Sequence, residues 1–229
     1  MKHSKRMTDA HKKIDNKVYD LKEGVETLQS VKGCKFDETL DMAVCLNVDT
    51  KSGQPLRGVV ALPSGTGKTV RVAVFARGPK AEEAKKAGAD IVGAEDLMET
   101  IQKGEINFDR CIATPDMMGV VGRIGRFLGP KGLMPNPKLG TVTMDVAKAV
   151  EAAKGGQIEY RMDKAGVVHA GLGKMSFKSA DLEKNVKVFV DALLKARPQG
   201  TKGVFMKKAY LSSTMGPSVA ISLADLGAS

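Results

Sequence analysis

Residues 70–113 read VRVAVFARGPKAEEAKKAGADIVGAEDLMETIQKGEINFDRCIA, and they decide the fold class of the middle of the chain. Short apolar runs predict strands at residues 70–76, 90–92 and 110–113. Helices are predicted in the same region at residues 79–87, 94–103 and, further along, 144–153. Because short apolar strands that alternate with helices are typical of a parallel sheet covered on both faces, the sequence predicts an α/β unit here.

The segments on either side of this block have a different pattern. Residues 39–48, TLDMAVCLNV, alternate with a period of two, which is typical of a half-buried strand with Leu40, Met42, Val44 and Leu46 on one face. The other elements expected here are helices at residues 5–20, 21–31 and 180–196, a strand at 56–62 as the neighbour of 39–48, a hairpin of 157–162 with 166–170, and closing strands at 204–212 and 218–223. Similar elements at both chain ends, enclosing an α/β block, indicate a domain interrupted by an insertion.

The charge of the chain points to a polyanionic partner. Lys and Arg number 36 against 26 Asp and Glu, which gives a formal net charge of +10. The excess is concentrated in basic runs at residues 1–17, 123–138 and 195–208, whereas residues 79–118 are net acidic. Nucleic acid is the first partner class that this charge favours, and an anionic membrane surface is the second.

Composition and spacing disfavour several other classes. The longest apolar runs, such as residues 72–76, are too short for a membrane helix, and no apolar region follows the basic N-terminus as a secretory signal requires. Cys34, Cys45 and Cys111 lie far apart, so we expect neither a disulfide framework nor a Cys-x-x-Cys metal site. This use of cysteine favours a cytoplasmic location. The histidines have no metal-binding spacing, so no metal is expected.

A nucleotide-binding loop is the enzyme alternative. Residues 63–69, PSGTGKT, match the end of a P-loop, but Leu62 stands where the phosphate cradle requires glycine. A strand is also predicted after Thr69, where a P-loop requires a helix. We therefore interpret this segment as a Gly-rich linker between domains and expect no catalytic residues.

Two positions have more than one interpretation from the residues alone. Phe36 lies between a lysine and an acidic pair just before a strand, a pattern that favours a core anchor. Residues 214–217, TMGP, form either a turn between two strands or a segment that lets a sugar–phosphate backbone approach closely. Since aromatic residues make up only 4% and Trp is absent, a stacking surface like that of an RRM is not expected.

Seven motifs, taken together, identify a family resemblance. In chain order they are KFDET at 35–39, GTGKTVRV at 65–72, ATPDMM at 113–118, GRFLGPKGLMPNPKLGTV at 125–142, RMDKAGVVHA at 161–170, GKMSF at 173–177 and STMGPSV at 213–219. From about residue 5 to 223 the chain resembles bacterial-type members of the ribosomal protein L-one family. The resemblance implies a split α+β domain, residues 1–67 and 157–229, and an inserted three-layer α/β domain of Rossmann-like type, residues 68–156.

The resemblance also implies partners and contact residues. Expected partners are a folded segment of large-subunit ribosomal RNA in the mobile stalk of the ribosome, deacylated tRNA at the exit site, and the mRNA of the protein's own operon, whose translation family members repress. The expected RNA-binding residues of the split domain are Lys35, Phe36, Thr39, Asp163, Lys164, His169, Ser176, Thr214, Met215 and Gly216. A second RNA or tRNA contact is expected at Arg123, Arg126, Lys131 and Lys138. Neither a cofactor nor a reaction follows.

Overall fold

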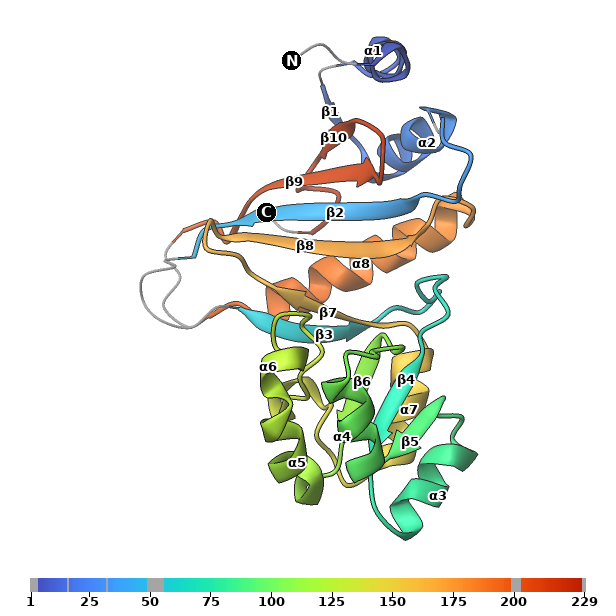
Figure 1. Cartoon of the computed structure of the whole chain (residues 1–229). Coiled ribbons are helices and arrows are strands. Elements are labelled where there is room, and N and C mark those ends of the chain that lie inside the picture. The colour runs from blue at the N-terminus through green and yellow to red at the C-terminus, as the bar shows by residue number, and fades with distance from the viewer. Residues whose placement is uncertain (1–3, 16, 32, 49–55, 199–202, 228–229) are drawn as a thin grey trace. The chain divides into compact units, whose positions relative to one another are not determined.

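The computed structural model describes residues 4–15, 17–31, 33–48, 56–198 and 203–227. Residues 52–55, which we expect to form the loop between the strands predicted at 39–48 and 56–62, lie outside these ranges, as does His3. The chain divides into two compact units, Met1–Gly67 with Ile158–Ser229, here called the split unit, and Lys68–Gln157, the inserted unit (Figure 1). No helix among the described residues is both long enough and apolar enough to cross a bilayer.

The split unit is built on a five-stranded sheet with the order β1-β10-β9-β2-β8. Its strands are β1 (Val18–Tyr19), β2 (Thr39–Leu46), β8 (Val167–Lys174), β9 (Met206–Ser213) and β10 (Ser218–Ile221). Only β1 pairs in parallel, with β10, and the other neighbours are antiparallel. In β2 every second residue from Leu40 to Leu46 is buried, so the predicted period of two is confirmed.

Helices α2 (Leu21–Val31) and α8 (Ser179–Lys195) pack on the face of the sheet that carries these buried residues (Figure 1). The helix predicted at 180–196 has the apolar stripe of an amphipathic helix, and α8 buries this stripe fully, at Leu182, Val186, Phe189, Val190 and Leu193. The ring of Phe189 meets that of Tyr160 edge-on, with centroids 5.9 Å apart. The core of the split unit is therefore formed between one sheet face and two amphipathic helices.

The pairing expected for two segments was wrong. Strand β3 (Arg57–Ala61) pairs with β7 (Gln157–Arg161) in a separate two-stranded sheet, and not with β2. Both edges of β2 are already occupied, by β8 and β9. The expected hairpin of β7 with β8 is reduced to a single bridge, Met162 to Val168, because the two strands join different sheets.

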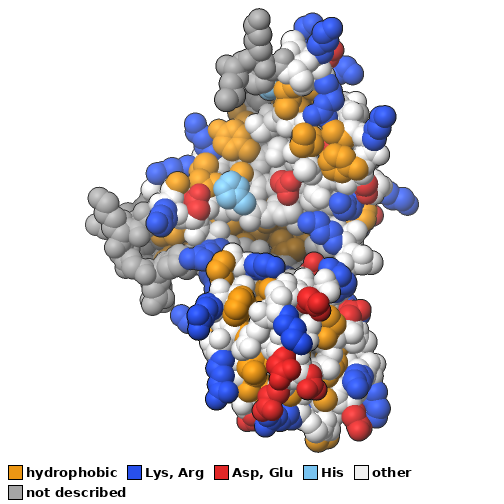
Figure 2. All heavy atoms as spheres, in the orientation of Figure 1, with side chains coloured by type: hydrophobic (Ala, Val, Ile, Leu, Met, Phe, Trp, Pro, Cys, Tyr) orange, Lys and Arg blue, Asp and Glu red, His pale blue; other side chains and the backbone are white. Residues whose placement is uncertain are grey.

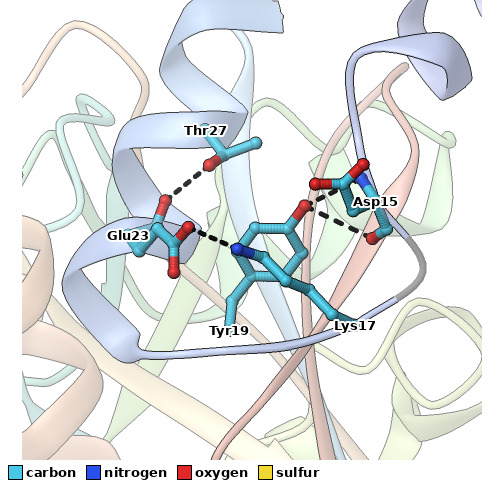
Figure 3. Close-up of polar contacts among 5 residues, drawn as sticks. All are labelled: Asp15, Lys17, Tyr19, Glu23 and Thr27. Atoms are coloured by element: carbon cyan, nitrogen blue, oxygen red, sulfur yellow. Dashed lines mark hydrogen bonds and ion pairs between the residues drawn. The ribbon is translucent and has the colours of Figure 1, made fainter.

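The predicted helix at residues 5–20 was wrong beyond its first half, because α1 spans only Lys5–Lys12. Figure 3 shows how the following segment is fixed: the Tyr19 hydroxyl accepts a hydrogen bond from the Asp15 N–H (2.9 Å) and donates to its carbonyl (3.3 Å). Lys17 lies over the Tyr19 ring and forms an ion pair with Glu23 at 2.8 Å. These contacts tie Asp15 to Tyr19 and Lys17 to α2, and Val18–Tyr19 add strand β1 to the sheet.

The inserted unit confirms the predicted α/β pattern. Its parallel sheet has the order β5-β4-β6, formed by β5 (Ile91–Gly93), β4 (Val72–Phe75) and β6 (Arg110–Ala113). Its helices are α3 (Pro79–Lys86), α4 (Glu95–Gln102), η2 (Pro115–Met117), α5 (Met118–Arg123), α6 (Gly125–Leu128), η3 (Pro137–Leu139) and α7 (Val146–Lys154).

Both faces of this central sheet are covered, which explains why β4 is continuously apolar. Ala73 and Phe75 pack in one cluster with α4, α5 and α6, whereas Val72 and Val74 pack in another with α3 and α7. All four residues of β4 are buried. A strand buried on both faces has no solvent side for polar residues, so it cannot alternate.

The linker between the units is held by Asn185, a fully buried polar residue of α8. Its side-chain oxygen accepts from the Ser64 N–H (3.2 Å), and its amide donates to the carbonyls of Gly65 (3.0 Å) and Leu172 (2.7 Å). Gly65 and Gly67 both have φ of 69°, a conformation that favours glycine. Strand β4 follows, as predicted, at the position where a P-loop requires a helix.

Candidate nucleic-acid interface

Three chain segments meet at one end of the five-stranded sheet. Thr39 begins β2 and pairs with Lys174 at the end of β8, and the next residue, Leu40, pairs with Ser213 at the end of β9. The residues just before β2, just after β8 and just after β9 therefore lie together. This group, here called the sheet-end site, contains seven of the residues expected from sequence: Lys35, Phe36, Thr39, Ser176, Thr214, Met215 and Gly216.

Thr214 is bonded to the backbone of Thr39. Its hydroxyl accepts from the Thr39 N–H at 2.9 Å and lies 3.4 Å from the Thr39 carbonyl, which also accepts from the Thr214 N–H at 3.1 Å. The hydroxyl thus has an intramolecular role, and replacing it with a methyl group would leave the Thr39 N–H without this acceptor. Thr214→Val should disturb the turn after β9 in addition to any RNA contact.

Glu38 anchors the same turn from beneath. It is only 1% exposed, and its carboxylate accepts from the Met215 N–H at 3.1 Å. Burial by itself raises the pKa of Glu38, but hydrogen bonds from Ser213, the Met215 N–H and Cys34 outweigh it, so the pKa lies below its ordinary value. A buried acid held as a carboxylate therefore fixes the backbone that presents Met215.

A second set of polar contacts fixes the segment before β2. The Ser176 hydroxyl donates to the Asp37 carboxylate at 2.7 Å, and Lys174 donates to the Asp37 carbonyl at 3.1 Å. At the turn after β9, a side chain added at Gly216 would collide with the Ser213 hydroxyl. Both loops are thus held by short-range contacts and are preorganised for a ligand.

Two large apolar side chains project from this fixed backbone. Phe36 is 51% exposed and Met215 is 49% exposed, so the core-anchor interpretation of Phe36 was wrong. Lys35 is also exposed beside Phe36. An exposed ring and thioether beside hydroxyl groups and a cation are suited to packing on sugars and bases of a structured RNA while the cation meets phosphate.

The structure does not bring the other three expected residues of the split unit into the sheet-end site. His169 is exposed at the third position of β8, opposite Ala43, and Asp163 and Lys164 lie in the turn before β8. Since β8 has eight residues, this turn lies about 25 Å from the sheet-end site. Asp163 caps the turn, because its carboxylate accepts from the N–H groups of Ala165 and Val167, both at 2.8 Å.

Sequence reasoning missed Glu38 and Lys174 as parts of the site. Glu38 lies within the KFDET motif, but an acid beside a basic surface gives no signal of a supporting role. Two of its partners, Ser213 and Met215, lie at the end of β9 and in the turn after it, and only the pairing of β2 with β9 brings them to Glu38.

The inserted unit carries the second group of expected residues. Arg123, Arg126, Lys131 and Lys138 are all exposed, and Phe127 (39%) and Met134 (40%) are exposed beside them in sequence. Figure 2 shows basic side chains over α5 and α6 and acidic side chains gathered over α4. Buried Leu128, Pro135 and Leu139 attach this basic segment to the unit.

Comparison with known families agrees with the resemblance found in the motifs. The model of the ribosomal protein L1p/L10e family matches residues 26–217, which include the inserted unit, most of the split unit, the sheet-end site and the basic segment. Because the match extends over most of the sequence, the chain belongs to the ribosomal protein L1p/L10e family, whose members are RNA-binding structural proteins of the ribosome.

Proposed function

We propose that this protein binds a folded segment of large-subunit ribosomal RNA in the ribosomal stalk through the sheet-end site. The observation that carries the proposal is the pair of exposed apolar side chains, Phe36 and Met215, on loops fixed by Glu38 and Thr214. A rigid surface of this kind loses little conformational entropy on binding, and shape recognition of RNA depends on such surfaces.

We further propose that the basic segment of the inserted unit contacts deacylated tRNA at the exit site and assists its release. Its exposed cations supply affinity for phosphate, and Phe127 offers an aromatic face for an unstacked base. Repression of the protein's own operon follows if its mRNA folds like the ribosomal RNA segment, since both RNAs would then compete for the sheet-end site.

A competition titration tests these proposals. The full chain should bind the stalk fragment of its own ribosomal RNA far more tightly than an unrelated hairpin of equal length, and the operon mRNA leader should displace that fragment. A tRNA should bind without displacing the fragment, and the Arg126→Ala, Lys131→Ala double variant should weaken tRNA binding alone. Equal affinity for the stalk fragment and the unrelated hairpin would contradict the main proposal.

A further inference from the structure

Arg6 joins three segments next to the sheet-end site. It lies in the first turn of α1, its guanidinium donates to the carbonyl of Met215 at 2.9 Å, and its other amino nitrogen donates to the Cys34 sulfur. The stem of its side chain lies against Gly33, where an added Cβ would be 3.4 Å from Cδ of Arg6. One side chain therefore bonds both the turn that carries Met215 and the segment that leads to Phe36.

Met215 is held from two sides as a result. Its N–H donates to the buried Glu38 carboxylate, and its carbonyl accepts from Arg6. A small cavity of about 10 Å³, with room for about one water molecule, is lined in part by Arg6, Glu38, Ser213, Met215 and Gly216. With its backbone N–H and carbonyl both engaged, Met215 has a fixed backbone from which its half-exposed side chain projects.

The helix that supplies Arg6 is itself anchored. Ser4 caps its N-terminus by accepting from the Met7 N–H, and Ala10 is buried. Beyond its far end, the Tyr19 hydroxyl binds the backbone of Asp15, and the Lys17–Glu23 ion pair attaches the following segment to α2 (Figure 3). Arg6 thus acts from an anchored helix. It lies outside the family match, which begins at residue 26.

We propose that Arg6 is a positioning residue for RNA recognition, which sets the conformation of the Thr214–Gly216 turn and so the direction of Met215. The proposal rests on the proposed function for its ligand and deepens it, because it adds the N-terminal helix to the recognition apparatus. Arg6 fits this role better than lysine would, since its planar fork donates from two nitrogens in fixed directions at once.

The test separates positioning from simple charge by comparing Arg6→Ala, Arg6→Lys and Lys5→Ala. Lys5 is the matched control, because it is an exposed cation next to Arg6 with no bond to the turn among those described. Affinity for the stalk fragment is measured between 50 and 200 mM salt, thermal midpoints are recorded, and the ¹³C-methyl resonance of Met215 is followed in the free protein.

We expect Arg6→Ala and Arg6→Lys each to weaken binding about tenfold, the scale of a lost charge-assisted hydrogen bond. Lys5→Ala should weaken it less than about twofold, and the salt slope of Arg6→Lys should equal that of wild type because the charge is kept. The Met215 methyl resonance should shift in both Arg6 variants and stay in place in Lys5→Ala, with thermal midpoints nearly unchanged in all three.

Full affinity in Arg6→Lys, or equal losses in Arg6→Ala and Lys5→Ala, would overturn the proposal and leave only a charge effect. An unchanged Met215 resonance in both Arg6 variants would overturn it as well. If wild type does not select the stalk fragment, the proposed function fails, and the methyl resonance in the free protein still decides whether Arg6 sets the turn.

Discussion

Glu38 shows how a single buried carboxylate links stability to pH next to the proposed RNA-binding surface. Because its pKa is lowered in the folded protein, its ionised form stabilises the fold. That contribution is complete above the ordinary pKa of a glutamate and is lost as the pH falls from there through the lower folded value. Protonation would weaken the acceptor for the Met215 N–H.

We expect Glu38→Gln to lower the free energy of unfolding by about 1–3 kcal/mol at pH 7. The difference from wild type should shrink as the pH falls below about 4.5, where wild type loses the same contribution. Denaturant unfolding of both proteins between pH 3 and 7 measures this. A difference that stays constant over the whole range would show that the charge of Glu38 does not stabilise the fold.

Met215 and Met144 form a matched pair for testing the site, since they are 49% and 54% exposed and lie in different units. Met215→Asp places a negative charge where RNA phosphates are expected, so it should weaken binding to the stalk fragment by about tenfold or more. Met144→Asp should change it by less than about threefold. Neither exposed substitution should move the thermal midpoint by more than a few degrees.

A midpoint that collapses in Met215→Asp would identify this residue as part of the core. Equal weakening by both aspartates would indicate general repulsion of RNA and would contradict the sheet-end site.

At the scale of elements, α8 does more for the split unit than cover its sheet. Phe189 is fully buried against the core, and Asn185 one turn earlier holds the linker. Phe189→Ala should lower the unfolding free energy by about 3–5 kcal/mol, because it leaves a cavity and removes the edge contact with Tyr160.

The control for this helix is Lys187→Ala, an exposed position two residues before Phe189, which should change the unfolding free energy by about 0.5 kcal/mol or less. Chemical denaturation followed by circular dichroism measures both variants. Similar small effects would mean that the core of the split unit does not depend on this helix.

The split unit and the inserted unit have cores made of separate residues. The cluster of the split unit contains no residue between Leu62 and Ile158, and the clusters of the inserted unit lie within residues 70–153. We expect that replacing residues 68–156 with a short Gly/Ser linker leaves a folded protein that still binds the stalk fragment, since loop closure depends weakly on length.

The bonds from Asn185 to Ser64 and Gly65 remain in this shortened chain and should hold one end of the linker. Binding of tRNA should be lost along with the basic segment. A shortened protein that is folded but binds the stalk fragment no better than an unrelated hairpin would place the primary site in the inserted unit.

The salt dependence of RNA affinity should report how many lysines and arginines of the whole molecule contact RNA phosphates. If six to ten phosphates are contacted, affinity should fall by about 10³–10⁵ between 50 and 200 mM salt. Lys35→Ala and Lys164→Ala should each reduce the slope by about one unit. Because Lys164 lies at the opposite end of β8, a reduced slope in both variants requires an RNA that extends along the sheet. An unchanged slope in both would show that neither lysine meets phosphate.

Local sequence patterns decided the elements of this protein. The period of two in β2, the apolar stripe of α8 and the continuous apolar run of β4 each record which faces of one element are buried, so they can be recognised one element at a time. Family motifs then indicated the segments expected to contact RNA, including Phe36, whose position just before a strand had favoured a core anchor.

Strand pairing and the sheet-end site were decided by the tertiary structure alone. Thr39 and Thr214 are bonded although they are 175 positions apart, and Arg6 reaches Met215 across 209 positions. The periodicity of a strand is the same whichever strand pairs with its edge. Periodicity therefore did not reveal that β8 and β9 occupy both edges of β2 and exclude β3. It also did not reveal that α1 ends at Lys12. Those outcomes depend on contacts between distant segments, which form only when the sheet and its helices pack together.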